Sequence, residues 1–371
     1  MKTSRFVFFC ILTILLVMVK CHPKEPLVTS SPLTLTNSHQ WTDLTFISPA
    51  IIPISGFREM ILFVSLRGES PGIYAVTPDG STLYRIITLP SSYQIMGHMD
   101  WTIKKNLLAF AMSSGERTDV VIADLLMASL HNITGGTQSG GTEPKWSPDG
   151  AQLAYICGDY EPDICVIDIE NMNVLQLTFH PSWDINPSWS PDGSTIAYQT
   201  NRGGLSDIYA INLQTRSEVD LTKGVAQNAQ PSWAPDGKHI LFQSDRNGSM
   251  DIFLVNPDGS GVTNLTPFES LEVDPQWSPT GEFIAFRSNR DGEWDLFIMK
   301  KDGSDIANLT KNWGPVFTFS WSPDGRRIAF SSGQYGSSKI YSVNVDDREV
   351  SNLTPQIDAM LPLWIALTPY K

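Results

Sequence analysis

The sequence predicts an all-β fold, a β-propeller built from four-stranded blades. A pentapeptide of nearly constant sequence, WSPDG or a close variant, recurs 43 or 44 residues apart and begins at Trp146, Trp189, Trp233, Trp277 and Trp321. Each period holds several short apolar runs separated by turn sequences, and none holds the long 3.6-residue pattern of a helical repeat. One such unit cannot bury both faces of its own small sheet, so neighbouring units must stack to form a core.

The unit that begins at Trp233 shows the four expected strands. Trp233 ends the first strand, and Pro235-Asp236-Gly237 supplies a turn because proline presets φ and glycine accepts a positive φ. Residues 239–244, 251–256 and 262–266 then read as three further short strands separated by turn residues. Four strands in one period match a propeller blade.

Counting these strands along the chain predicts seven blades and the way in which the ring closes. Pairs of second and third strands begin near Ile61, Leu107, Gln152, Thr195, His239, Phe283 and Arg327. First strands end at Trp101, Trp146, Trp189, Trp233, Trp277, Trp321 and Trp364. The first unit therefore lacks its first strand, and we expect the C-terminal strand to complete it and remove the unpaired edges. Six blades are the alternative, if residues 41–57 or the unit at Trp101 pack irregularly.

The N-terminal residues read as a targeting segment. Lys2 and Arg5 precede an apolar run of 14 residues, 6–19, which is short for a membrane span. Cys21 follows directly, and the segment resembles a bacterial lipoprotein leader, in which the cysteine at the cleavage site is lipidated. Lys20 departs from that pattern, because a small residue is usual there, so lipidation of Cys21 stays open. We expect a leader over 1–20, a Pro/Ser/Thr-rich tether and lead-in over 21–58, and the propeller over 59–371 of a protein exported to the cell envelope.

The charge balance disfavours some partners. The chain has a net charge of −13, and removal of the leader with Lys2, Arg5 and Lys20 brings it near −16. Such a surface argues against nucleic acid, and it equally suits a soluble monomer. The sequence contains no glycine-rich phosphate loop, so we expect no nucleotide or other cofactor.

Two cysteines remain in the predicted propeller, on the second and third strands of one blade. One interpretation is that Cys157 and Cys165 pair across a hairpin, where a disulfide would persist in an exported protein. The alternative is two buried, unbonded cysteines, because sequence does not show whether their Cβ atoms meet.

The WSPDG units, their S-[DN]-R-x-G loops and their D-[IL]-[YF] strands resemble the TolB-like propeller repeats, over about four-fifths of the chain. Similar repeats occur in the non-catalytic propellers of prolyl oligopeptidase-type and tricorn-type proteases. TolB proper carries an N-terminal α/β domain, for which residues 27–58 are too few, so the resemblance covers the propeller alone. No G-x-S-x-G nucleophile elbow is present, which disfavours a serine hydrolase.

Residues that recur in every unit are weak candidates for a function performed once per molecule. We expect the WSPDG tryptophans to pack between blades. The repeated Arg202, Arg246 and Arg290 are expected to pair across the turn with Asp207, Asp251 and Asp295.

Positions that differ between units are better candidates. The first strand of a blade lines the central channel, and the residue three before each tryptophan changes from blade to blade. These residues form a predicted ring at the channel mouth: His98, Glu143, Asn186, Gln230, Asp274 and Thr318, with Leu361 as the apolar exception. Unlike hydrogen-bonding groups suit an asymmetric polar ligand such as a peptide or sugar chain, whereas the plainer interpretation is a mouth that simply holds water.

Two functions follow as hypotheses. The first is a non-catalytic binding or scaffold propeller of the bacterial cell envelope, which holds a peptide or protein partner at the channel mouth, as the TolB resemblance implies. The second is a carbohydrate-active enzyme, because some propellers of this class resemble polyuronate lyases with a channel metal. Of the six histidines only His98 lies on the predicted ring. His98, Glu143 and Asp274 would be the ligands of a divalent ion in the channel. We expect no metal and no catalytic residue.

Overall fold

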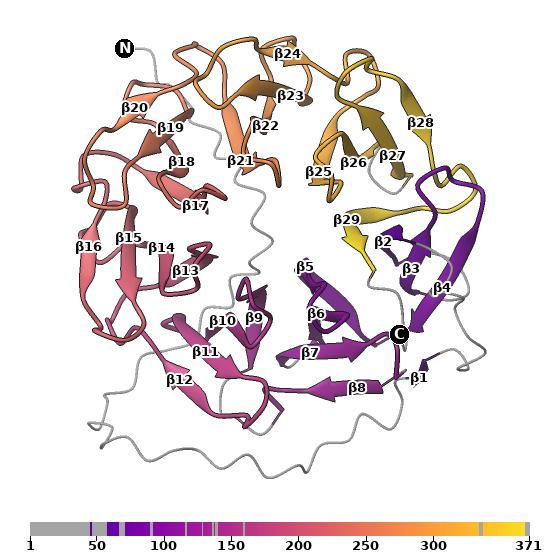
Figure 1. Cartoon of the computed structure of the whole chain (residues 1–371), viewed down its shortest axis with the longest axis horizontal. Coiled ribbons are helices and arrows are strands. Elements are labelled where there is room, and N and C mark those ends of the chain that lie inside the picture. Colours follow the sequence, from indigo (N-terminus) through magenta and orange to yellow (C-terminus); the bar gives the residue numbers. More distant parts are fainter. Residues whose placement is uncertain are drawn as a thin grey trace, which may run out of the picture. The chain divides into compact units, whose positions relative to one another are not determined.

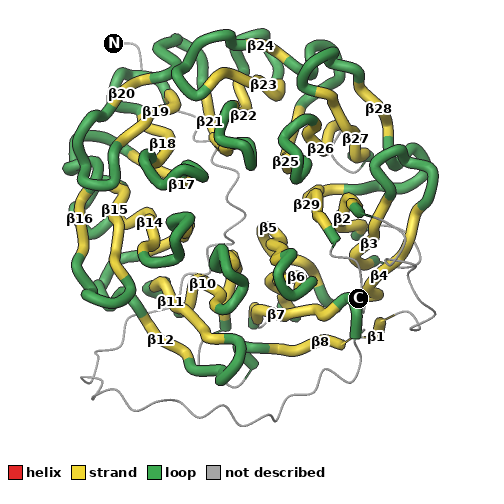
Figure 2. The backbone as a smooth tube through the Cα atoms, in the orientation of Figure 1, coloured by secondary structure: helices red, strands yellow, loops and turns green. Residues whose placement is uncertain are grey.

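The structure is a computed structural model that describes residues 45–46, 58–66, 71–89, 92–115, 117–127, 129–135, 137, 140–158, 160–333 and 337–367. All of them belong to one compact unit, residues 33–371. The leader predicted over 1–20, Cys21 and most of the predicted tether lie outside the described residues. Within the described part of the chain all regular structure is β, and no helix is long and apolar enough to cross a membrane (Figure 2).

Seven antiparallel sheets form a closed ring, which confirms the predicted propeller (Figure 1). Blade 1 comprises β29 (Met360–Ala366), β2 (Glu59–Ser65), β3 (Gly72–Val76) and β4 (Leu83–Thr88), with β1 (Thr45–Phe46) paired to the outer edge of β4. Blade 2 comprises β5 (Gln94–Thr102), β6 (Leu107–Ser113), β7 (Thr118–Asp124) and β8 (Ser129–Asn132). Blade 3 comprises β9 (Gly141–Trp146), β10 (Gln152–Cys157), β11 (Asp163–Asp168) and β12 (Val174–Gln176).

The other four blades repeat this order without interruption. Blade 4 comprises β13 (Asp184–Trp189), β14 (Thr195–Thr200), β15 (Asp207–Asn212) and β16 (Glu218–Asp220). Blade 5 comprises β17 (Asn228–Trp233), β18 (Ile240–Ser244), β19 (Asp251–Val255) and β20 (Thr263–Asn264). Blade 6 comprises β21 (Glu272–Trp277), β22 (Phe283–Ser288), β23 (Asp295–Lys300) and β24 (Ala307–Asn308). Blade 7 comprises β25 (Val316–Trp321), β26 (Arg327–Ser332), β27 (Lys339–Asn344) and β28 (Val350–Asn352).

The C-terminal strand closes the ring. β29 pairs antiparallel with β2, placing Trp364 opposite Ile61, and the first blade thereby gains the inner strand that its own sequence lacks. The indole N–H of Trp101 in blade 2 donates to the carbonyl of Ala366 at 2.9 Å. Because β29 pairs with β2, the inner edge of β2 is not left unpaired.

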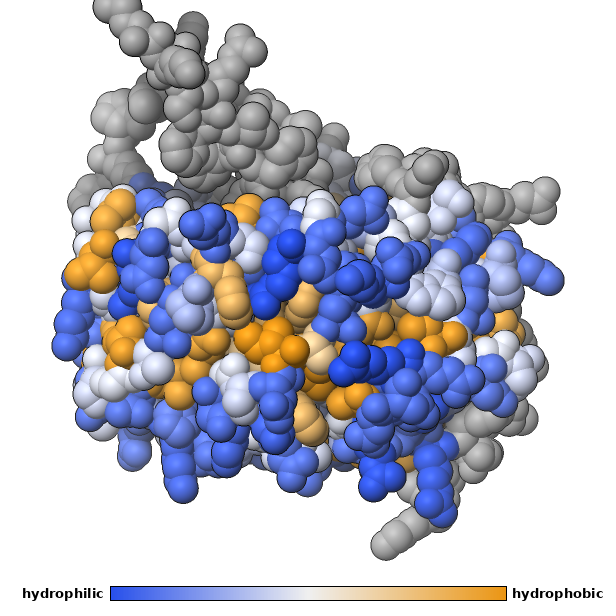
Figure 3. All heavy atoms as spheres, turned by 90° about the horizontal axis from the view of Figure 1, so that it is seen from above, coloured by the Kyte–Doolittle hydropathy of each residue, from blue (hydrophilic) through white to orange (hydrophobic). Residues whose placement is uncertain are grey.

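The WSPDG tryptophans lie between blades. Trp146 packs with Val120 of the preceding blade and Leu153 of its own. The indole N–H of Trp189 donates to the carbonyl of Lys145 in the blade before it, at 2.9 Å. Each tryptophan therefore joins two sheets. On the side of the ring seen in Figure 3, apolar residues form a band between two hydrophilic rims.

The repeated arginines do not pair with the aspartates that follow them, so that prediction was wrong. Arg246 lies over the rings of Phe242 and Phe253, at 5.1 and 4.8 Å, and donates to Asn228 Oδ1 at 2.9 Å. In blade 6, Arg290 likewise reaches the buried Glu272, at 3.2 Å. Each arginine thus crosses its own sheet to the first residue of the inner strand. Strand pairing decides this, because it brings that residue closer than the neighbour in sequence.

Blade 3 has a disulfide between its second and third strands. Cys157 and Cys165 are bonded, with their Cα atoms 5.8 Å apart, and both are buried. Cys157 occupies the position of Thr200 in blade 4, and Cys165 occupies that of Tyr209. The inner strand of this blade begins with Gly141, which offers no side chain for an arginine to bind.

Candidate functional site

The inner strands of the seven blades surround the centre of the ring, which we call the channel (Figure 1). These strands are β29, β5, β9, β13, β17, β21 and β25. They begin at one end of the blades, which we call the entry end. Antiparallel pairing places two kinds of segment at the same end: the loops between second and third strands, and the segments that join one blade to the next. The predicted ring residues lie close to the start of each inner strand.

Most ring residues sit at a bulge. In blade 3, Thr142 pairs with Ile156 and Lys145 pairs with Ala154, so Glu143 and Pro144 share one partner position. The extra residue turns the strand and takes a left-handed backbone, with φ of 49° at Glu143. The same conformation recurs at Asn186, Gln230, Asp274 and Leu361, with φ of 53° to 56°.

Positive φ at residues other than glycine costs energy and recurs at functional sites. Asparagine and aspartate tolerate it, but Glu143, Gln230 and Leu361 gain no such local compensation. Two blades depart from the pattern. In blade 2 Gly97, with φ of 64°, takes the left-handed position before His98, and in blade 7 Thr318 pairs in register with Ser331.

A second set of polar side chains supports the ring from the neighbouring strand. Asn186 Nδ2 donates to Gln199 Oε1 at 2.8 Å, and Thr318 Oγ1 lies 2.8 Å from Ser331 Oγ. Arg287 Nε donates to Asp274 Oδ2 at 2.6 Å. The supports belong to the second strand of their own blades, and these contacts fix the direction of the ring side chains.

The supporting set was not among the residues predicted from sequence. It consists of Gln199, Gln243, Arg287 and Ser331, each next to last in its second strand. Gln243 reaches the next blade, where its Oε1 accepts the backbone N–H of Asp274 at 2.9 Å. The available signal was a polar residue near the end of an otherwise apolar strand, as in TIAYQT and FIAFRS.

The charged groups of blades 2 and 3 are strongly perturbed. Enclosure by the channel walls, and then the charge of Lys145, lower the pKa of His98 to about 4. Enclosure raises the pKa of Glu143, against the opposing effects of Lys145 and the backbone N–H of Asn186. Burial also raises the pKa of Asp100, although its Oδ2 accepts the backbone N–H of Trp146 at 2.6 Å. Solvent still reaches His98 and, in part, Glu143, so channel water offsets some of this desolvation.

The predicted ion set does not form a metal site. Within the described part of the chain, no three His, Cys, Asp or Glu side chains group closely enough to hold a metal ion. Asp274 instead forms an ion pair with Arg287. His98, Glu143 and Asp274 therefore do not fit the channel metal considered from sequence.

Exposed aromatic side chains gather at the entry end. Four aromatic residues are exposed among those the structure describes, namely Tyr160, Phe179, Phe268 and Trp313. All four lie in entry-end segments, between β10 and β11 or between consecutive blades. Aromatic residues are enriched where proteins bind one another.

Solved structures similar to this chain share its fold. TolB from Acinetobacter baumannii is 18% identical with a TM-score of 0.53, and the match covers 84% of each chain. An oligogalacturonate lyase in complex with manganese is 12% identical with a TM-score of 0.61, covering 79% of this chain and 84% of that one. The S511A mutant of puromycin hydrolase, complexed with PGG, is 14% identical with a TM-score of 0.66, covering 80% of this chain and 52% of that one. At these identities the likeness concerns the fold.

No curated protein sequence matches the chain. A family model does match, and its description is TolB beta propeller domain. It matches three overlapping segments, 85–212, 141–286 and 263–362, as expected for a tandem repeat. The chain belongs to the TolB beta propeller domain family.

Proposed function

We propose that this protein is a non-catalytic binding propeller of the bacterial cell envelope, which holds a peptide or protein partner at the entry end of its channel. One observation carries the proposal: the ring of unlike polar residues and the exposed aromatic side chains share that end. Polar groups fixed at bulges supply directional hydrogen bonds, and aromatic side chains supply apolar area.

The strained backbone of the ring favours binding over a merely wet channel lining. A left-handed conformation at Glu143 and Gln230 costs free energy, which a side chain that only contacts water does not offset. Because the supports hold Asn186 and Asp274 in place, a ligand need not order these side chains when it binds.

The location is part of the same proposal. A charged N-terminal region followed by an apolar run supports export, and Cys21 after that run supports a lipid anchor. Lys20 opposes the anchor, so a secreted, unlipidated form is the alternative outcome. Mass spectrometry of the mature N-terminus separates an intact leader, a lipidated Cys21 and an unmodified cut.

A carbohydrate-active enzyme is the second candidate. The raised pKa of Glu143 and the lowered pKa of His98 favour it, because groups with perturbed pKa values cluster at catalytic sites. The arrangement of Asp274 disfavours it, since Arg287 already pairs with this carboxylate. An enzyme that uses this channel would therefore need acid–base chemistry that does not depend on a metal bound by His98, Glu143 and Asp274.

The test is a Glu143→Ala/Asp274→Ala double variant of the mature protein. Its matched control is Glu170→Ala/Glu282→Ala, which removes the same charge from exposed side chains at the opposite end of the blades. Capture of partners from envelope extract is quantified by mass spectrometry, and turnover is followed on acidic polysaccharides by the absorbance of an unsaturated product.

A partner captured by the wild type and the control variant but lost in the channel variant, with no turnover, supports the binding role. Turnover that disappears only in the channel variant supports the enzyme and contradicts our proposal. Equal capture by all three proteins shows that the ring is ordinary wet lining.

A further inference from the structure

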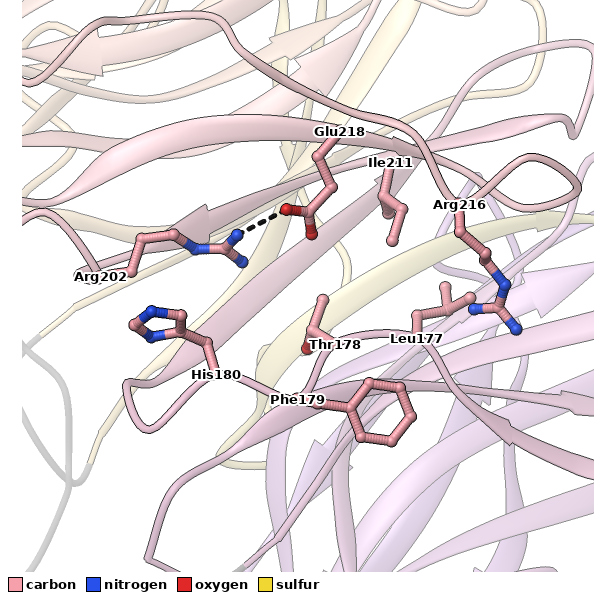
Figure 4. Close-up of a pocket in the computed structure, with 8 residues that line it drawn as sticks. All are labelled: Leu177, Thr178, Phe179, His180, Arg202, Ile211, Arg216 and Glu218. Atoms are coloured by element: carbon pink, nitrogen blue, oxygen red, sulfur yellow. Dashed lines mark hydrogen bonds and ion pairs between the residues drawn. The ribbon is translucent and has the colours of Figure 1, made fainter. Parts of the chain in front are cut away.

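A pocket on the outer wall, between blades 3 and 4, is separate from the channel ring. It is a hollow of about 510 Å³ that is open to solvent. The segment after β12 forms one side, and strands and loops of blade 4 form the other (Figure 4). The lining residues that matter here are Leu177, Phe179, Arg202, Ile211, Arg216 and Glu218.

One side of the pocket is a fixed polar cluster. Arg202 lies over the Tyr198 and Tyr209 rings, at 5.6 and 4.6 Å from their centroids. Its Nη1 donates to Glu218 Oε2 at 2.6 Å, and the Tyr198 hydroxyl donates to Glu218 Oε1 at 2.7 Å. Glu218 thus balances the positive charge of Arg202. The Arg202 guanidinium also contacts the buried Asp184, with Nη2 3.4 Å from Oδ2.

The opposite side carries an arginine with no such match. Figure 4 shows Arg216 across the pocket from the Arg202–Glu218 pair, with the Phe179 ring between them along the lower wall. Among the residues that the structure describes, no hydrogen bond or ion pair is formed by the Arg216 guanidinium. The Phe179 side chain is 74% exposed, while Leu177 and Ile211 form a buried apolar floor.

The pocket contains one clear departure from the repeat. Glu218 stands where every other complete repeat has an apolar residue: Leu130, Val174, Val262, Ile306 and Val350. Phe179-His180 follows a Leu-Thr pair, at a position where the units differ: Lys223-Gly224, Pro267-Phe268, Lys311-Asn312 and Pro355-Gln356. The repeat does not explain Glu218, and Glu218 and Phe179 line one pocket although they lie about 40 residues apart in the sequence.

We propose that this pocket binds a carboxylate carried on an apolar group, with Arg216 pairing the carboxylate and Phe179 covering the apolar part. The net charge of the whole chain is −13, whereas the exposed Arg216 guanidinium beside an apolar floor is free to attract an acid. A guanidinium matches the planar, two-oxygen geometry of a carboxylate. The ligand is either a small organic acid or the C-terminal carboxylate of a peptide ending in an apolar residue.

The test uses 3-phenylpropionate, its neutral analogue 3-phenylpropanamide, and the peptide acetyl-Gly-Gly-Phe with a free or an amidated C-terminus. Binding to the mature protein is measured by saturation-transfer NMR and calorimetry. Arg216→Gln should weaken binding of the acids about tenfold or more, because it removes an ion-paired hydrogen bond. Arg348→Gln is the matched control, since Arg348 occupies the same turn in blade 7 with φ of 62° against 59° at Arg216.

Acids that bind while amides do not, with a loss in Arg216→Gln and none in Arg348→Gln, support the proposal. Phe179→Ala should also weaken binding, and its exposed position leaves the fold intact. A tighter free-acid peptide identifies a chain terminus as the ligand, and a tighter 3-phenylpropionate identifies a small acid. Equal affinity for acid and amide, unchanged binding in Arg216→Gln, or no binding of any probe overturns it.

Discussion

Closure of the ring by β29 makes a sharp prediction about stability. A chain that ends at Ala359 lacks the whole strand, so β2 loses its inner partner and blade 1 loses its contact with the channel. Three large side chains that are buried in the intact ring disappear with it: Trp364, 5% exposed, Ile365, 1% exposed, and Leu367, 5% exposed.

The cost follows from that burial. Each such side chain contributes about 1.5 to 3 kcal/mol when buried, so their loss removes about 5 to 9 kcal/mol. Proteins are stable by only about 5 to 15 kcal/mol in total. The truncated chain should therefore unfold at a much lower urea concentration, or fail to unfold cooperatively at all.

Urea unfolding followed by tryptophan fluorescence measures this effect, with two point variants as calibration. Ile365→Ala should lose about 2 to 5 kcal/mol, because the cavity lies in the closing sheet. Val219→Ala, on the exposed outer strand β16, should change stability by less than about 0.5 kcal/mol. A peptide of residues 360–367 added to the truncated chain should restore its midpoint. If the truncated chain unfolds at the wild-type midpoint, closure by β29 does not stabilise the ring.

Three further predictions concern other parts of the chain. Replacing Cys157 and Cys165 by serine should cost about 2.5 kcal/mol by opening their short loop, and an unchanged urea midpoint would contradict this. Burial, together with the neighbouring Glu272, raises the pKa of Asp251 to about 6. This group binds its proton more tightly in the folded state, so its contribution to stability falls as pH rises from about 4 through 6. The stability of Asp251→Asn relative to the wild type should therefore increase as pH rises from about 4 through 6, and a constant difference over this range would refute the assignment. Export predicts a mature N-terminus at or near Cys21, which an intact leader in mass spectrometry would disprove.

The repeat by itself determined the architecture. Tryptophans at a constant spacing and one turn sequence per unit fixed four strands per blade, because local turn chemistry and apolar alternation depend only on nearby residues. The sequence has one first strand more, ending at Trp364, than it has complete units, and the first unit lacks such a strand. Counting the strands was therefore enough to predict the closure, without any distance between residues. The ring of differing residues also followed from alignment of the units, and the structure places it on the channel-lining strands.

Only the tertiary structure decided which side chains meet. Arg290 reaches Glu272, which precedes it by 18 residues, rather than the nearby Asp295, because sheet pairing sets the distance. A proline follows Glu143 and marks this position in the sequence, but the left-handed backbone and the bulge became visible only from the pairing of β9 with β10. The pocket of Phe179 and Arg216 exists because two blades pack side by side, and contacts between separate sheets are not encoded in the spacing of either one.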